Sequence, residues 1–205
     1  LHDWSSDVCS SDLDKTYYEV RMKEFFHQFH SQLPPTRVWG YEGQLPGPII
    51  EVEEGECTHI LWINDLPDKH FLPLDRTLHA SGHNMPEVRT VVHLHGAMVE
   101  PESDGYPDAW FTNGFGKCGP RFSRKVYRYP NQQRPTMLWY HDHALGITRL
   151  NVYAGLAGLY IIRNEEERSL NLPSGVYEIP LVIQDKSFNT DGSLFYPSKV
   201  DVQDP

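Results

Sequence analysis

The sequence is poor in positive charge and in cysteine, and it lacks a long uncharged hydrophobic run. Its 205 residues include 18 lysines and arginines against 28 aspartates and glutamates, for a formal net charge of −10. Because the acidic residues are dispersed and no basic surface is expected, nucleic acid and anionic lipid are disfavoured as partners. No apolar run approaches the roughly 20 residues that cross a bilayer, so the sequence predicts no membrane span.

The three cysteines have no C-x-x-C spacing and define neither a disulfide framework nor a redox compartment. Cys9 lies in DWSSDVCSSDL, which matches the translation of a common sequencing-library adapter. We therefore expect residues 1–13 to be an artefact joined to a genuine reading frame near Asp14, and we exclude them from the fold prediction. Cys57 and Cys118 remain, and both are expected to be packed or loop thiols.

What the chain does contain is a set of short alternating or apolar runs separated by proline, glycine and asparagine. The hydrophobic share of 39% and the aromatic share of 12% are enough for a packed core. The spacing of the runs is typical of a β-sandwich or small barrel, and LGITRLNV at 145–152 is expected to form a short helix. The predicted strands are 16–22, 36–41, 48–53, 57–64, 89–95, 123–129, 136–141, 157–163 and 177–185.

A domain boundary is expected at the charged and turn-rich run EEERSLNLPSG, residues 165–175. The prediction is one β domain at 14–166, followed at 167–205 by a linker and the truncated start of a second β domain. The run YEIPLVIQD would be the opening strand of that domain, but the sequence stops at Pro205 before anything can cover its apolar faces. We therefore expect a chain that is cut at both ends.

Two pairs of histidines stand one residue apart, in VVHLHG at 91–96 and in WYHDHA at 139–144. Residues i and i+2 of a strand point to the same face, so His93 and His95 should project together, and so should His141 and His143. If the two strands are neighbours, four imidazoles converge on one patch. Four apolar residues are expected to pack beneath that patch: Val91, Val92, Leu138 and Trp139.

A lone histidine is more often satisfied by a backbone carbonyl than bound to a metal. Two H-x-H pairs at the ends of apolar strands reverse that expectation, because clustered imidazoles are costly unless a metal or a partner satisfies them. Imidazoles without thiolate or carboxylate partners suit copper, zinc or iron, and affinity alone favours copper.

Several longer segments resemble the amino-terminal cupredoxin domain of a multicopper oxidase, in the branch of bacterial spore-coat laccases and bilirubin oxidases. The resemblance covers residues 14–198. It implies an all-β, cupredoxin-like Greek-key sandwich, followed by the first strand or strands of a second cupredoxin-like domain. The segments that carry it are HLHG, WYHDHA, GQLPGPII, SDGYPDAWF, PNQQRPTMLWYHDHALGITRLNVYAGLAG and DGSLFYPS.

The resemblance implies a role for each histidine. His93 resembles the type 2 copper ligand of this domain, and His95, His141 and His143 resemble ligands of the type 3 copper pair. Asp104 resembles the acidic residue that these oxidases place near the trinuclear cluster, where it would relay protons. Its alternative is an ordinary Asp-Gly turn.

The implied parent is a laccase-like enzyme that couples one-electron oxidation of phenolic or bilirubin-like reductants to reduction of dioxygen to water. The remaining cluster ligands and the type 1 copper site would belong to missing carboxy-terminal cupredoxin domains, since neither Cys57 nor Cys118 has histidine on both sides. The fragment alone is therefore expected to be inactive. The resemblance also suggests a spore-coat location.

Two rival functions remain open on the sequence. One is a non-catalytic copper-binding or structural protein of the same fold, and the other is a mononuclear metal site made by the four imidazoles alone. The remaining histidine pairs, His79 with His83 and His27 with His30, are expected to be loop, structural or solvated residues. GFGKCG at 114–119 satisfies G-x-G-x-x-G but lacks a βαβ context and is expected to be a loop.

Overall fold

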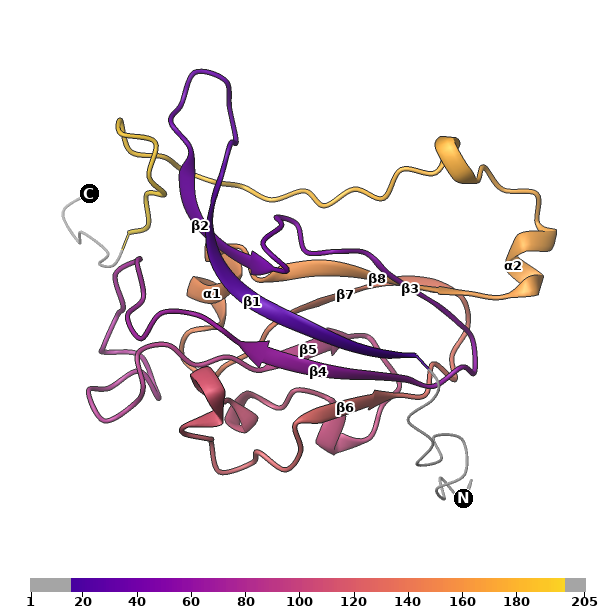
Figure 1. The fold of residues 1–205 in the computed structure, drawn as a ribbon, viewed down its shortest axis with the longest axis horizontal. Coiled ribbons are helices and arrows are strands. Elements are labelled where there is room, and N and C mark those ends of the chain that lie inside the picture. The colour runs from indigo at the N-terminus through magenta and orange to yellow at the C-terminus, as the bar shows by residue number, and fades with distance from the viewer. Residues whose placement is uncertain (1–15, 198–205) are drawn as a thin grey trace, which may run out of the picture.

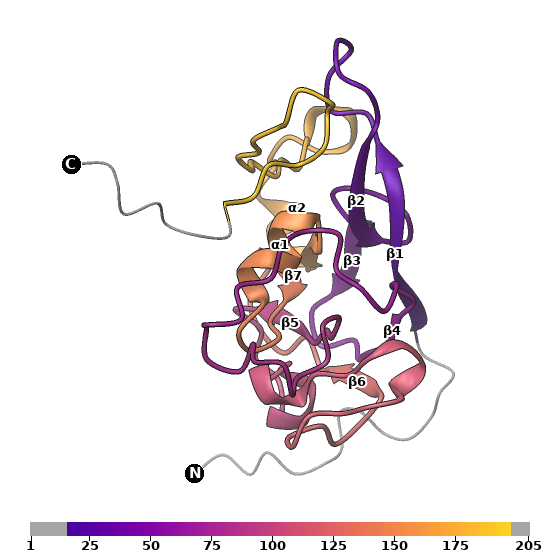
Figure 2. The ribbon, with the colours of Figure 1, turned by 90° about the vertical axis from the view of Figure 1, so that its left-hand side faces the viewer.

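Two four-stranded sheets pack face to face in the computed structural model, which describes residues 16–197 (Figures 1 and 2). In Figure 2 the two layers are seen edge-on, with β1 and β2 on one side and β7 and α1 on the other. The segment assigned to an adapter artefact, residues 1–13, lies outside the described range.

The first sheet has the strand order β2-β1-β4-β6. The long strand β1 pairs antiparallel with β2 and parallel with β4, and β4 pairs antiparallel with β6. Alternating burial along these strands puts one face of the sheet into the core, as period-2 hydrophobic patterns predict. The strands are β1 (Tyr17–His27), β2 (Thr36–Tyr41), β4 (Thr58–Asn64) and β6 (Val126–Tyr129).

The second sheet has the order β3-β8-β7-β5 and carries both H-x-H pairs at one edge. The strand β8 pairs parallel with β3 and antiparallel with β7, which pairs antiparallel with β5. The all-β sandwich predicted from the sequence is confirmed, and each of the first eight predicted strands overlaps an observed one. The strands are β3 (Ile50–Glu53), β5 (Val92–His95), β7 (Thr136–Asp142) and β8 (Ala157–Arg163).

The predicted short helix near 145–152 is confirmed as α1, Thr148–Ala154. A second helix, α2 (Glu165–Ser169), occupies part of the run expected to be a boundary, and Asn164 caps it by accepting the Glu167 N–H. The short 3-10 helices are η1 (Pro101–Ser103), η2 (Pro107–Ala109), η3 (Asn113–Phe115) and η4 (Gly175–Tyr177).

Buried aromatic rings join the two sheets. Tyr41 on β2 and Tyr140 on β7 meet edge to face with ring centroids 4.9 Å apart, and Trp62 on β4 contacts both rings. All three side chains are almost fully buried. Each ring of this size removes enough apolar surface from water to contribute about 3 kcal/mol or more. The packing therefore fixes β7, and with it one histidine pair, against the opposite sheet.

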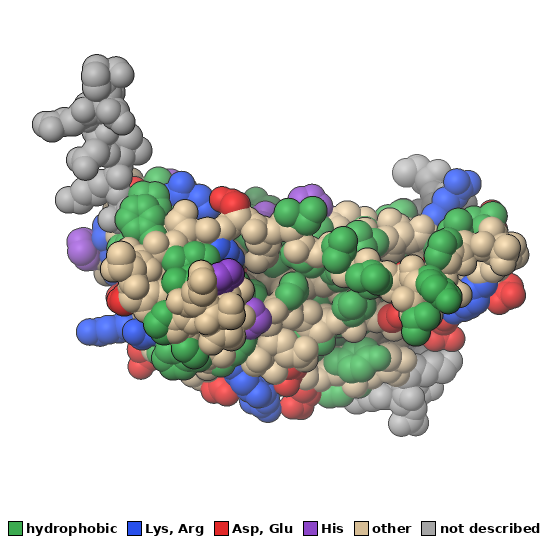
Figure 3. Space-filling model, turned by 90° about the horizontal axis from the view of Figure 1, so that it is seen from above, with side chains coloured by type: hydrophobic (Ala, Val, Ile, Leu, Met, Phe, Trp, Pro, Cys, Tyr) green, Lys and Arg blue, Asp and Glu red, His purple; other side chains and the backbone are tan. Residues whose placement is uncertain are grey.

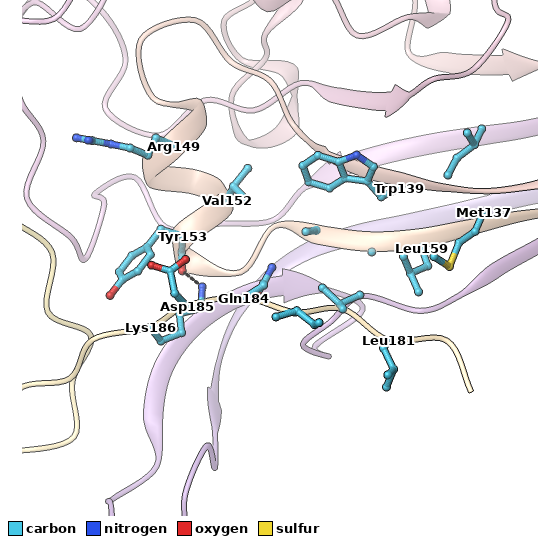
Figure 4. Close-up of a pocket in the computed structure, with 15 residues that line it drawn as sticks. Met137, Trp139, Arg149, Val152, Tyr153, Leu159, Leu181, Gln184, Asp185 and Lys186 are labelled. Atoms are coloured by element: carbon cyan, nitrogen blue, oxygen red, sulfur yellow. Dashed lines mark hydrogen bonds between the residues drawn. The ribbon is translucent and has the colours of Figure 1, made fainter. Parts of the chain in front are cut away.

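The prediction of a strand at 177–185 is wrong for this structure, because residues 178–187 are extended but form no ladder. A strand needs a hydrogen-bonded neighbour, and none is provided among the described residues. Ile183 is 95% exposed. Figure 3 shows hydrophobic side chains along this face of the molecule, and Figure 4 shows the segment crossing the outer face of β7 and β8. A cavity of about 570 Å³ lies there, and its lining includes Met137, Trp139 and Leu159.

Candidate metal centre

The strands β5 and β7 bring the two histidine pairs together. His93 stands directly opposite His141 in the antiparallel register, and His143 follows one residue after β7 ends. Val92 and Leu94 are fully buried, whereas His93 is partly exposed and His95 is exposed. The histidines therefore project from the outer face of the second sheet, while alternate residues fill the core.

All four imidazoles lie within one cluster. His93 lies at the centre, with its ring centroid 5.3 Å from that of His95, 5.6 Å from that of His141 and 4.9 Å from that of His143. The centroids of His95 and His141 are 5.5 Å apart. The predicted convergence of the four rings is confirmed, whereas their role as copper ligands stays a prediction.

Backbone carbonyls fix the orientation and tautomer of three rings. The Nδ1 atom of His93 lies 2.5 Å from the Asp104 carbonyl oxygen, and that of His141 lies 2.7 Å from the Asp142 carbonyl oxygen. The Nδ1 atom of His143 lies 3.3 Å from the Gly105 carbonyl oxygen. A carbonyl can only accept, so each Nδ1 carries the proton and each Nε2 of the neutral ring keeps a free lone pair.

The fourth ring faces His141 directly. The Nδ1 atom of His95 lies 3.3 Å from the Nε2 atom of His141. Two imidazole nitrogens bound at about 2.0 Å to one tetrahedral metal ion would be about 3.3 Å apart. Because the Nε2 of His141 is unprotonated, it accepts a hydrogen bond from the Nδ1 of His95. The same separation would fit a shared soft or borderline metal ion, and the all-imidazole donor set suits copper.

Burial keeps the inner rings neutral. Desolvation lowers the pKa of His141 to about 4, with further lowering by the other three histidines. Desolvation, followed by the nearby His93, also lowers the pKa of His143. A neutral imidazole is the form that binds a metal, so both shifts favour metal binding at neutral pH.

Asp104 lies beside His93, as the sequence predicts. Its backbone carbonyl accepts the short hydrogen bond from the Nδ1 of His93. Its carboxylate Oδ1 lies 3.4 Å from the same Nδ1, and the Asp104 side chain is 42% exposed. The turn follows η1 and continues into Gly105, so the Asp-Gly turn and the placement near the histidines are both present. Its proton-relay role is a prediction.

Gly105 allows this turn to approach the histidine strand. Its φ of +74° is a left-handed conformation, and a Cβ built there would lie 2.0 Å from the Val92 carbonyl oxygen. Only glycine fits both requirements. The close approach brings the carbonyls of Asp104 and Gly105 within reach of the rings of His93 and His143.

The sequence analysis missed the buried polar group beneath the cluster. Asp142, between the two histidines of the second pair, points into the core and is fully buried. Its carboxylate accepts hydrogen bonds from the backbone of Val91 and Ala144 and from the side chain of Asn151. A charged residue inside an otherwise apolar strand was the available signal, whereas nothing in the sequence identified Asn151.

One residue assigned to the packing beneath the histidines lies elsewhere. Trp139 was expected to support the patch from below together with Leu138, but its side chain is 38% exposed. Its ring stacks on His141 with centroids 4.0 Å apart. The reason is the strand period: Trp139 and His141 are two residues apart on β7 and therefore share the outer face.

Other groups that could compete as metal ligands are separate from this cluster. His79 and His83 are exposed and lie in a loop, as predicted. Cys118 is an exposed free thiol, and Cys57 is disulfide-bonded, so the expectation of a thiol there is wrong. Within residues 16–197 no group of three or more His, Cys, Asp or Glu is arranged to hold one metal ion.

Comparison with known proteins assigns the family. Residues 72–167 match the family model described as multicopper oxidase. The chain is 59% identical over 187 residues to a laccase of Bacillus subtilis and 48% identical over 191 residues to a laccase of Haloferax volcanii. These alignments cover 90% and 89% of this chain but only 36% and 33% of the relatives, so the chain spans about a third of their length.

Solved structures agree with this assignment. A multicopper oxidase from Pediococcus acidilactici matches with a TM-score of 0.68 and 28% identity, over 88% of this chain and 32% of that one. The chain belongs to the multicopper oxidase family, and its closely similar relatives include bacterial and archaeal laccases. The cupredoxin-like sandwich predicted from the sequence is confirmed. Copper is the cofactor that the family implies, and the donor set described above fits it.

None of the helices among residues 16–197 is both long enough and apolar enough to cross a membrane.

Proposed function

We propose that the chain is part of a laccase-like multicopper oxidase and provides half of the copper ligands at its oxygen-reducing site. His93 would hold the type 2 copper, and His95, His141 and His143 would hold the type 3 pair. The observation that carries the proposal is the facing pair of nitrogens on His95 and His141, which are 3.3 Å apart.

The histidines supply preformed lone pairs. When bound, copper would provide the one-electron redox chemistry by which such oxidases reduce dioxygen. The rings of His93 and His143 stack with an interplanar angle of 26°, and each is held by a backbone carbonyl. Rings fixed in this way lose little conformational entropy when a metal binds, which raises affinity.

Asp104 would move protons. Reduction of dioxygen to water consumes four protons, so the site needs a group that can deliver them. The carboxylate of Asp104 is part-exposed and close to the Nδ1 of His93, so it can exchange protons with water on one side and face the site on the other.

The rest of the activity would depend on parts of the protein beyond this chain. The type 1 copper, its cysteine, four further cluster histidines and the reductant pocket would come from carboxy-terminal cupredoxin domains. Phenolic or bilirubin-like molecules would be the reductants, and this chain alone would not turn over substrate. A spore-coat location stays a prediction.

The test uses the full-length protein encoded by the complete reading frame. The proposal expects about four coppers per chain, blue absorbance from a thiolate-bound copper, and dioxygen consumption with a phenol. His141→Ala should abolish dioxygen consumption while the blue absorbance persists, and His79→Ala should change neither. One metal per chain without blue colour, or equal losses in both variants, would reject the proposal.

A further inference from the structure

A carboxylate is buried in the core directly beneath the histidine cluster. The side chain of Asp142 has no solvent-exposed surface and points to the opposite face of the strand from His141 and His143. Placing an ionisable group in an apolar core costs several kcal/mol unless hydrogen bonds and opposite charge offset it. Packing alone would favour an apolar residue at this position, so the carboxylate calls for another explanation.

The partners of Asp142 require an acceptor. Oδ1 accepts the backbone N–H of Val91 at 3.0 Å, and Oδ2 accepts the backbone N–H of Ala144 at 3.1 Å and the Nδ2 of Asn151 at 2.9 Å. All three are N–H donors, and a carboxylate is a side chain that can accept from all of them without presenting a donor. Arg89, also fully buried, adds favourable charge.

These bonds join the two histidine-bearing segments where the sheet ladder stops. The pairing of β5 with β7 ends at Val92 opposite Asp142, and His143 lies beyond it. Val91 precedes His93 by two residues, and Ala144 follows His143 directly. Beyond the ladder one backbone hydrogen bond, from the His143 N–H to the Val91 carbonyl at 2.8 Å, still joins the two segments. The carboxylate adds a second connection at the same place, through the N–H groups of Val91 and Ala144.

Asn151 holds the carboxylate in place from α1. Its Nδ2 donates to Asp142 and to the Arg89 carbonyl at 3.0 Å, and its Oδ1 lies 3.2 Å from the Nε2 of His70. The Nδ1 of His70 accepts the Leu72 N–H at 3.0 Å, so the ring must donate through Nε2. Each polar atom of the Asn151 amide thus has a partner, and the amide has one allowed orientation.

We propose that Asp142, oriented by Asn151, is a positioning residue that sets the relative placement and ring orientation of His141 and His143 for copper. This inference rests on the proposed function for its metal, whereas the hydrogen bonds that carry it lie entirely within the chain. It acts through the protein backbone: when Asp142 is removed, the hydrogen bond from the His143 N–H to the Val91 carbonyl is the connection that remains there. The backbone around His143 is then less constrained, and its ring meets the Gly105 carbonyl only part of the time.

The experiment reads histidine tautomers by long-range ¹H–¹⁵N NMR on the metal-free chain. The wild type should show unprotonated Nε2 on His93, His141 and His143. In Asp142→Asn and in Asn151→Ala, His143 should become a mixture of tautomers, and the affinity for Cu(I) in a chelator competition should fall by about 10- to 100-fold. Ile60→Ala, in β4 of the other sheet, is the control for lost stability.

The outcomes separate the possibilities. Unchanged tautomers and copper affinity in both variants would overturn the proposal, and so would equal changes in Ile60→Ala at a matched loss of Tm. Failure of both variants to fold would also reject it, because the network would then serve the whole domain. If the wild type shows the expected tautomers but binds no copper, the proposed function fails while the positioning stands.

Discussion

The Nδ1 atom of His95 lies 3.3 Å from the Nε2 atom of His141, although one ring projects from β5 and the other from β7. Each strand carries its ring on the outer face, and the antiparallel register sets His95 diagonally from His141. Because the His141 Nδ1 donates to a carbonyl, its Nε2 presents a lone pair to the neighbouring ring. The two nitrogens therefore lie at the separation that two ligands of one tetrahedral metal ion would have.

Removing either ring of this pair should weaken copper binding. We expect His95→Ala and His141→Ala to raise the Kd for Cu(I) at least about tenfold, because each removes one of a few nitrogen donors. A chelator competition measures this. His79→Ala, an exposed loop histidine, is the matched control, and an equal loss in that variant would show that binding is adventitious.

Gly105→Ala should disturb both the fold and the histidines. The new Cβ would overlap the Val92 carbonyl oxygen and force an alanine into a left-handed conformation, which together should cost about 3 kcal/mol or more. Gly43→Ala also has a positive φ, but nothing lies near its added Cβ, so it should cost only about 1 kcal/mol. Urea unfolding compares the two. Similar losses of unfolding free energy in the two variants would show that the close approach of Gly105 to the Val92 carbonyl does not affect stability.

His70 should make the domain sensitive to acid. Burial lowers its pKa to about 4, whereas an unfolded histidine titrates near 6.5. Below pH 6.5 the unfolded chain binds a proton at His70, whereas the folded chain does not. The free energy of unfolding should therefore fall as pH drops toward 4. The total loss is roughly 3 kcal/mol.

The control is His70→Gln, which keeps a donor for Asn151 but does not titrate. Its unfolding free energy, measured by urea at pH 7.0 and about pH 4.5, should change less than that of the wild type. Other histidines contribute equally to both proteins, so the difference isolates His70. Identical pH dependence in the two proteins would contradict the assignment of a neutral, buried ring.

Asp104→Asn separates positioning from proton transfer. The backbone carbonyl of Asp104, not its carboxylate, makes the short bond to His93, so the ring orientation and the copper content should survive the substitution. Dioxygen consumption by the full-length protein should fall about 100-fold if the carboxylate relays protons. Loss of copper in this variant, or unchanged turnover, would argue against the relay.

The fold and the four histidines could be predicted because both depend on period-2 patterns. Alternation placed His93 with His95 and His141 with His143, and apolar runs located the eight strands. The failed strand at 177–185 shows the limit: its pattern is correct, but pairing depends on a neighbour that the described residues do not supply. Trp139 shows a second limit. Its large apolar side chain suggested a place in the core, whereas its position two residues before His141 puts it on the outer face of the sheet.

The supporting groups could not be predicted because they act through long-range and backbone contacts. The carbonyls of Asp104 and Gly105 hold His93 and His143 without any side-chain signal, and only the fold brings Asn151 from α1 to Asp142. The buried aspartate was visible as a charge in an apolar strand, and the strand period puts its side chain opposite the two histidines. Its hydrogen-bond partners were not visible in the sequence.

The most direct test of the account is the EPR spectrum of the chain with one equivalent of Cu(II). The account predicts hyperfine structure from at least two imidazole nitrogens, altered in both His95→Ala and His141→Ala and unchanged in His79→Ala. A spectrum that is the same in all three variants, or one that shows oxygen ligands alone, would contradict the claim that these rings form a copper site.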